Sequence, residues 1–159
     1  MQLKPEIRTA LERINFGSRC KNFSQKYSFA FNECFEKYDN KEVVNIFKEL
    51  GYKAVHIKKE NFFRITEGIN DYKFEFNISL KYGCTEFIWA VWKEKELQTG
   101  SPWGALKKLL EDNDERLQTP LFRNYDELKE ILQEALIMYE DFKRELLDIY
   151  SCEKEDKSI

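Results

Sequence analysis

The segment from residue 71 to 82 constrains the fold of this chain more than any other feature. Large apolar residues occupy every second position, and the positions between them are polar or charged: Tyr72, Phe74, Phe76, Ile78, Leu80 and Tyr82 alternate with Lys73, Glu75, Asn77, Ser79 and Lys81. Successive side chains of a strand point to opposite faces, so this alternation predicts one apolar and one solvated face. It is typical of an antiparallel sheet.

Three neighbouring segments extend this sheet, at residues 53–58, 62–66 and 85–92. In the first, Val55 and Ile57 are predicted to face the core, with His56 on the other side. The last has apolar residues on both faces, which predicts a strand covered at least in part on both sides. Residues 97–101 break the pattern. The sequence therefore predicts about four antiparallel strands within residues 53–92.

Helical spacing dominates on both sides of this region. The expected helices cover residues 4–14, 24–38, 40–50, 101–110 and 126–150, the fourth capped by Ser101 with Pro102 in its first turn. Residues 15–25 and 113–124 are predicted to be loops. The expected architecture is α+β: a single domain over residues 1–150, in which N-terminal helices and a long C-terminal helix pack the sheet. Residues 151–159 are expected to form a charged, frayed tail.

The residue counts exclude several kinds of chemistry. The chain of 159 residues has one histidine, His56, and four cysteines without a C-x-x-C pair: Cys20, Cys34, Cys84 and Cys152. A two-histidine metal site is therefore impossible within one chain, and we expect neither a metal nor a cofactor. Glycine-rich phosphate loops are missing. No apolar run reaches the roughly 18 residues of a membrane span. Without a secretory signal, we expect a cytoplasmic protein with reduced thiols and no membrane partner.

The charge of −3 is distributed unevenly along the chain. Residues 1–60 contain 12 Lys/Arg and 8 Asp/Glu, a net charge of +4, whereas residues 111–159 contain 7 and 15, a net charge of −8. A nucleic-acid partner is disfavoured, because the acidic third repels phosphate. A basic protein is the expected partner.

The long C-terminal helix concentrates these acidic residues on one face. At about 100° per residue, Glu130, Glu134, Asp141 and Asp148 fall within about 40° of each other, and Glu127 and Glu145 lie beside them. Ile137 projects into the same stripe. Two interpretations stay open: a solvated outer face with one stray isoleucine, or a docking ridge with Ile137 as its apolar anchor. We take all seven residues as candidate partner-binding residues.

The enzyme alternative has less support, and we predict no catalytic residue. A Cys–His pair requires His56 beside a cysteine, and a carboxylate pair drawn from Glu75 and Glu86 has no known separation in space. The aromatic and basic residues of 19–27 are compatible with nucleic-acid binding but equally with a helix core.

In size, acidity and lack of catalytic motifs, the whole chain resembles the small immunity proteins of bacterial toxin–immunity systems. The acidic stripe and the aromatic segment 72–92 are closest to that class. The resemblance implies an α+β protein that inhibits a toxin, often a basic nuclease, by binding it. The leading hypothesis is thus a non-enzymatic immunity or inhibitor protein. The alternatives are a small enzyme with a Cys–His or carboxylate site against the sheet, or a structural subunit of a larger assembly. The sequence leaves the oligomeric state open.

Overall fold

A computed structural model describes residues 2–157, with the exception of the side chains of residue 31 and residues 155–157. Five antiparallel strands follow each other in chain order: β1 (Val55–Ile57), β2 (Phe62–Ile69), β3 (Tyr72–Ser79), β4 (Glu86–Lys93) and β5 (Glu96–Pro102). The helices are α1 (Pro5–Arg13), α2 (Phe16–Lys26), α3 (Asn40–Glu49), α4 (Trp103–Glu111) and α5 (Tyr125–Lys157). Two short 3-10 helices cover Phe31–Glu33 and Lys81–Gly83. The predicted α+β class is confirmed.

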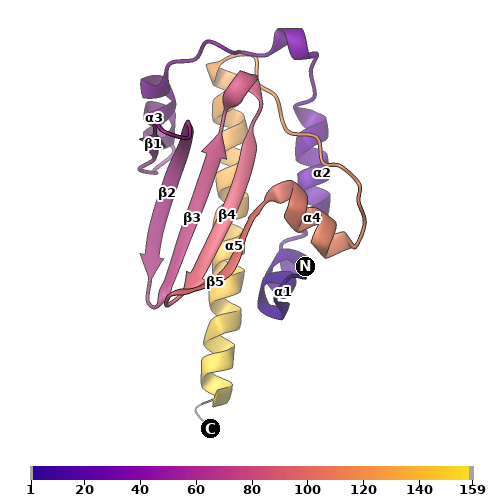
Figure 1. The fold of residues 1–159 in the computed structure, drawn as a ribbon, viewed down its shortest axis with the longest axis vertical. Coiled ribbons are helices and arrows are strands. Elements are labelled where there is room, and N and C mark those ends of the chain that lie inside the picture. The colour runs from indigo at the N-terminus through magenta and orange to yellow at the C-terminus, as the bar shows by residue number, and fades with distance from the viewer. Residues whose placement is uncertain (1, 158–159) are drawn as a thin grey trace.

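The helices lie on one face of the sheet, with α5 running along its length (Figure 1). Their apolar residues form one core with Phe63, Phe74, Phe76, Trp89 and Val91, all of which are buried. Phe76 and Trp89 are paired in register between β3 and β4. The alternation of residues 72–79 thus places its apolar residues in the core as predicted.

The other face of the sheet carries no helix in the described part of the chain (Figure 1). Ile88 and Trp92 are nevertheless half-buried there and Ala90 between them is buried, so β4 is covered in part on this face, as expected, by neighbouring side chains such as Lys73 and not by a helix. Glu75 also lies on this face, but it is buried, because Arg64 and Lys73 approach its carboxylate at 3.7 and 3.3 Å.

The sheet has one more strand than predicted. β5 pairs with β4 from Pro102 opposite Ile88 to Glu96 opposite Lys93, with a bulge at Val91 and Trp92. β5 is an edge strand that packs little side-chain surface into the core, so its sequence contains few apolar residues. The alternation of apolar and polar residues that would have predicted a strand is therefore weak here. Ser101 belongs to this strand, so the predicted cap of α4 is wrong and Pro102 takes the N-cap position.

Two predictions near the N-terminus are also wrong. The loop expected at residues 15–25 is instead mostly helical: residues 16–26 form α2 and bury Phe16, Cys20 and Phe23. The helix expected at residues 24–38 is missing after Lys26, because residues 27–38 contain only the short 3-10 helix Phe31–Glu33. Aromatic residues of this segment instead pack against the start of α5: the ring centroid of Phe35 lies 4.9 Å from that of Tyr125. Aromatic, Asn and Cys side chains favour helix only weakly, so tertiary contacts decide this segment.

The strand prediction is wrong for the end of β3 and for the faces of β1. β3 ends at Ser79 and not at Tyr82, which adopts a left-handed conformation with its side chain exposed. In β1 the assignment of faces is reversed, since His56 is paired with the buried Phe63 and Val55 is exposed.

At the C-terminus α5 runs on through Lys157. The prediction of a frayed tail at 151–159 stays a prediction, and residues 158–159 lie outside the described residues.

Candidate functional site

The seven candidate residues of α5 lie on the side of the helix that faces away from the sheet. We call this set the α5 outer face: Glu127, Glu130, Glu134, Ile137, Asp141, Glu145 and Asp148. The opposite side of α5 is buried, with Leu128, Ile131, Leu132, Ala135, Tyr139, Phe142 and Leu146 in the core. The helix begins after Asn124, whose side-chain oxygen accepts a hydrogen bond from the backbone N–H of Glu127 at 2.8 Å.

The carboxylates of the α5 outer face have basic or hydroxyl partners, mostly on α1 and α2. Arg19 donates to Asp141 at 2.9 Å and Lys26 to Glu134 at 2.6 Å. Arg13 lies 3.3 Å from Asp148 and 3.8 Å from Glu145. The basic N-terminal part of the chain is therefore folded against the acidic C-terminal helix, so part of the charge asymmetry is satisfied within the molecule.

The other two carboxylates, Glu127 and Glu130, lie near the N-terminal end of α5 and have partners there. The Tyr27 hydroxyl donates to Glu130 at 3.4 Å. Arg123 donates to both oxygens of Glu127, at 2.9 and 2.8 Å, and these bonds lower the pKa of that carboxyl. The hydrogen bond that Lys26 donates to Glu134 raises the pKa of Lys26, because it favours the charged form of the lysine. Each of the six carboxylates of the face thus has a partner within the molecule.

Ile137 stands at the middle of the α5 outer face with half of its side chain exposed, at 50%. It lines two hollows at once. The first, of about 380 Å³, lies between α2 and α5, and the second, of about 240 Å³, includes Leu50 and Tyr52 after α3. An apolar side chain between two hollows has the form of an interface anchor.

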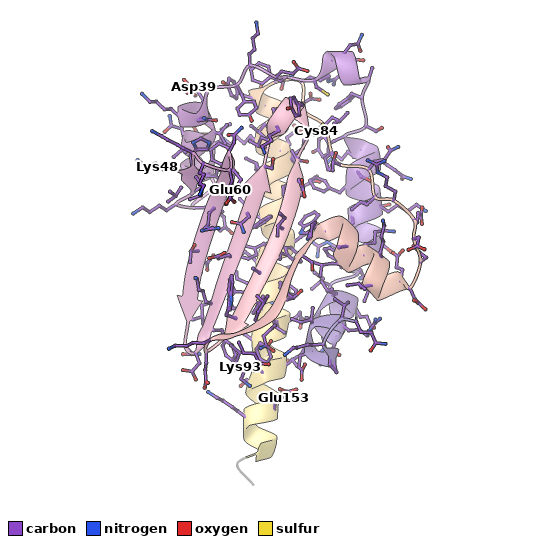
Figure 2. The ribbon with its side chains drawn as sticks, viewed as in Figure 1. Asp39, Lys48, Glu60, Cys84, Lys93 and Glu153 are labelled. Carbon is purple, nitrogen blue, oxygen red and sulfur yellow. The ribbon has the colours of Figure 1, made fainter. Side chains whose placement is uncertain are left out.

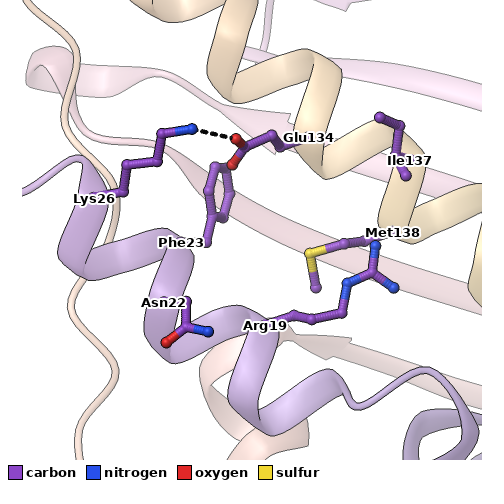
Figure 3. A pocket seen from close by; sticks show the side chains of 7 residues that line it. All are labelled: Arg19, Asn22, Phe23, Lys26, Glu134, Ile137 and Met138. Carbon is purple, nitrogen blue, oxygen red and sulfur yellow. Dashed lines mark hydrogen bonds and ion pairs between the residues drawn. The ribbon is translucent and has the colours of Figure 1, made fainter.

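The hollow between α2 and α5 has an apolar floor and a charged rim (Figure 3). The buried side chains of Phe23 and Met138 form the floor. The ion pair of Lys26 with Glu134 lies at one end, and Arg19 lies on the α2 side beside Met138. Charged groups around an apolar floor are the usual arrangement of a protein-binding patch.

The residues of the enzyme alternative do not meet. His56 lines a separate hollow between α3 and β1, and no cysteine is among the described residues that line it. Burial raises the thiol pKa of Cys20, Cys34 and Cys84, which makes them weaker nucleophiles.

The two carboxylates of the other enzyme candidate are not neighbours in the sheet. Glu75 is opposite Ala90, four residues along β4 from Glu86. The carboxylate of Glu75 is bound instead by Arg64 and Lys73, at 3.7 and 3.3 Å.

Comparison with known proteins assigns no function. No protein-family model matches the chain, and neither a curated protein nor a solved structure shows significant similarity to it. Within residues 2–157, no group of three or more His, Cys, Asp or Glu side chains is placed to hold a metal ion. No helix in that range combines the length and the apolar character that crossing a bilayer requires.

Proposed function

We propose that this protein is a non-enzymatic binding protein that docks the α5 outer face on a basic surface of another protein. The observation that carries the proposal is the position of Ile137, which is exposed between two hollows while the neighbouring Leu136 and Met138 are buried. A large apolar side chain at the centre of a charged face is the arrangement expected of an interface anchor.

The internal ion pairs support docking by holding the charged groups in place. A carboxylate has about four acceptor positions. Lys26 contacts one oxygen of Glu134, whereas Asp141 contacts Arg19 with one oxygen and Arg144 with the other, so each carboxylate keeps further acceptor positions. Basic groups of the partner protein would share these carboxylates. Little side-chain entropy is then lost on binding, because the ion pairs have already ordered the rim.

An immunity or inhibitor protein is the form of this function that we favour. The partner would be a basic toxin domain, and binding would occur in the cytoplasm of a bacterium, where the thiols stay reduced. Inhibition would follow from covering the basic surface with which a nuclease holds its substrate.

A structural subunit is a second candidate, which the open face of the sheet favours. Val55 and Leu97 are exposed on this face, and Ile88 and Trp92 lie between them. Light scattering on the purified chain tests this candidate, because a subunit that assembles with itself through this face becomes monomeric in the variant Trp92→Lys.

The docking proposal is tested by binding kinetics against a partner obtained by photo-crosslinking. A benzophenone amino acid at position 137 should capture the partner, whereas the same group at position 97 should not. Leu97 is the matched control because it is 49% exposed, against 50% for Ile137. Surface plasmon resonance then measures Ile137→Ala, which should mainly speed dissociation and depend weakly on salt.

Reversal of two acidic residues should act on association instead. Glu134→Lys with Asp141→Lys should slow association at low salt, and the defect should shrink as salt rises, because screening removes electrostatic steering. The control exchanges one internal pair, Lys26→Glu with Glu134→Lys, which leaves net charge unchanged and should change the association rate less. If Ile137→Ala and the reversed variant both bind like the parent, the α5 outer face is only solvated and the proposal fails.

A further inference from the structure

A larger hollow lies between the first turns of α3 and the strand β1, with a volume of about 890 Å³. Its lining comes from residues 38–45 on one side and from His56 and Lys58 on the other. Its size is within the range of small-molecule sites, which is about 300–1,000 Å³. None of its lining residues belongs to the α5 outer face.

The hollow is locally basic in an acidic protein. Lys41 and Lys58 line it, both are exposed, and neither forms an ion pair with any group in the described part of the chain. Asp39 is the one carboxylate among the lining residues, and its Oδ1 accepts a hydrogen bond from the backbone N–H of Lys41 at 2.9 Å. The two lysines therefore outnumber the local negative charge, whereas the whole chain carries −3.

The uncharged groups of the hollow suit an anion with an organic part. Asn40 and Asn45 bring amide donors, and Tyr38 and Val44 bring half-buried apolar surface. His56 is held in one orientation: its Nε2 lies 3.0 Å from Oδ1 of Asn61, and its ring centroid lies 4.9 Å from that of Phe63. Because a carbonyl oxygen only accepts, Nε2 is the donor of that bond.

We propose that this hollow binds a small phosphate monoester, with the phosphate between Lys41 and Lys58 and the organic group against Tyr38 and Val44. A phosphate monoester has about −1.5 to −2 charges at pH 7, which matches two lysines. Lysine binds phosphate as a compact charge and does not require a bidentate geometry.

The single histidine of the chain makes a direct test possible, because its Cε1–H proton gives one NMR signal without assignment. Phenyl phosphate is titrated at low salt and constant pH. The proposal expects a saturable shift of this signal with phenyl phosphate, a weaker response to inorganic phosphate, and none with phenol. The absence of a saturable shift with phenyl phosphate overturns the proposal.

Charge variants decide whether the two lysines are responsible. Lys41→Ala and Lys58→Ala should each weaken binding about fivefold, as expected for loss of one exposed charge contact. Asp39→Asn keeps a residue that caps α3 and should tighten binding, because it removes a like charge. Lys48→Ala is the matched control, since Lys48 lies on α3 outside the hollow (Figure 2). If Lys48→Ala weakens binding as much as Lys41→Ala, the attraction is non-specific and the proposal is wrong.

Discussion

At the scale of single residues, Phe76 links aromatic residues of the sheet to aromatic residues of the helices. Its ring lies 5.0 Å from that of Tyr139 on α5, 6.0 Å from that of Trp89 and 5.7 Å from that of Phe87. It is fully buried, so Phe76→Ala removes these contacts and leaves a cavity. We expect it to lower the free energy of unfolding by about 3–5 kcal/mol, measured by urea denaturation.

Glu75, on the other face of the same strand, provides the comparison. Its carboxylate is shielded by Arg64 and Lys73, so Glu75→Ala should cost about 1 kcal/mol, more than a solvated position costs. Glu86→Ala, at an exposed residue of β4, should stay within about 0.5 kcal/mol of the parent. If Phe76→Ala costs no more than Glu75→Ala, the two faces of β3 are assigned incorrectly.

At the scale of elements, α2 is attached to α5 by two ion pairs of different exposure. The side chains of Arg19 and Asp141 are 32% and 24% exposed, whereas those of Lys26 and Glu134 are 58% and 38% exposed. A double-mutant cycle should therefore give a coupling energy of about 1 kcal/mol for the first pair and a clearly smaller one for the second. Equal coupling energies would mean that solvent screening does not distinguish the two pairs.

At the scale of the whole molecule, burial of weak acids makes the fold sensitive to alkaline pH. Burial raises the pKa of the Cys20 thiol above its ordinary value of about 9, and also the pKa of the Tyr52, Tyr139 and Tyr150 hydroxyls. The folded state then keeps protons that the unfolded state loses. The stabilisation is complete below pH 9 and is lost as pH rises.

We therefore expect the free energy of unfolding to fall from pH 9 upward, and more steeply above pH 10, where the tyrosines contribute. Cys20→Ala should reduce the slope between pH 9 and 10 by about 1 kcal/mol per pH unit. Denaturant melts across this range measure the slope. An unchanged slope in Cys20→Ala would show that this thiol does not contribute.

The sequence predicted elements well where one side of an element is buried over many residues. The alternation at 72–79 and the helical stripe of residues 126–150 each repeat the same burial pattern several times, so errors at single positions cancel. Phe16, Cys20 and Phe23 also have helical spacing, which would have identified α2 had the polar residues between them not been read as a loop. β5 offered no such signal, because an edge strand buries little side-chain surface.

The sequence by itself determined the α+β class, the inward face of β3 and the side of α5 on which the acidic residues and Ile137 lie, because these depend on local periodicity alone. Only the tertiary structure decided which distant charges meet. Arg19 and Asp141 are 122 residues apart in the chain, yet they form an ion pair. Residues 38–45 likewise meet His56 and Lys58 only because α3 packs beside β1. Periodicity fixes which face a residue occupies, but contacts between elements depend on how the elements pack, and that is a property of the whole core.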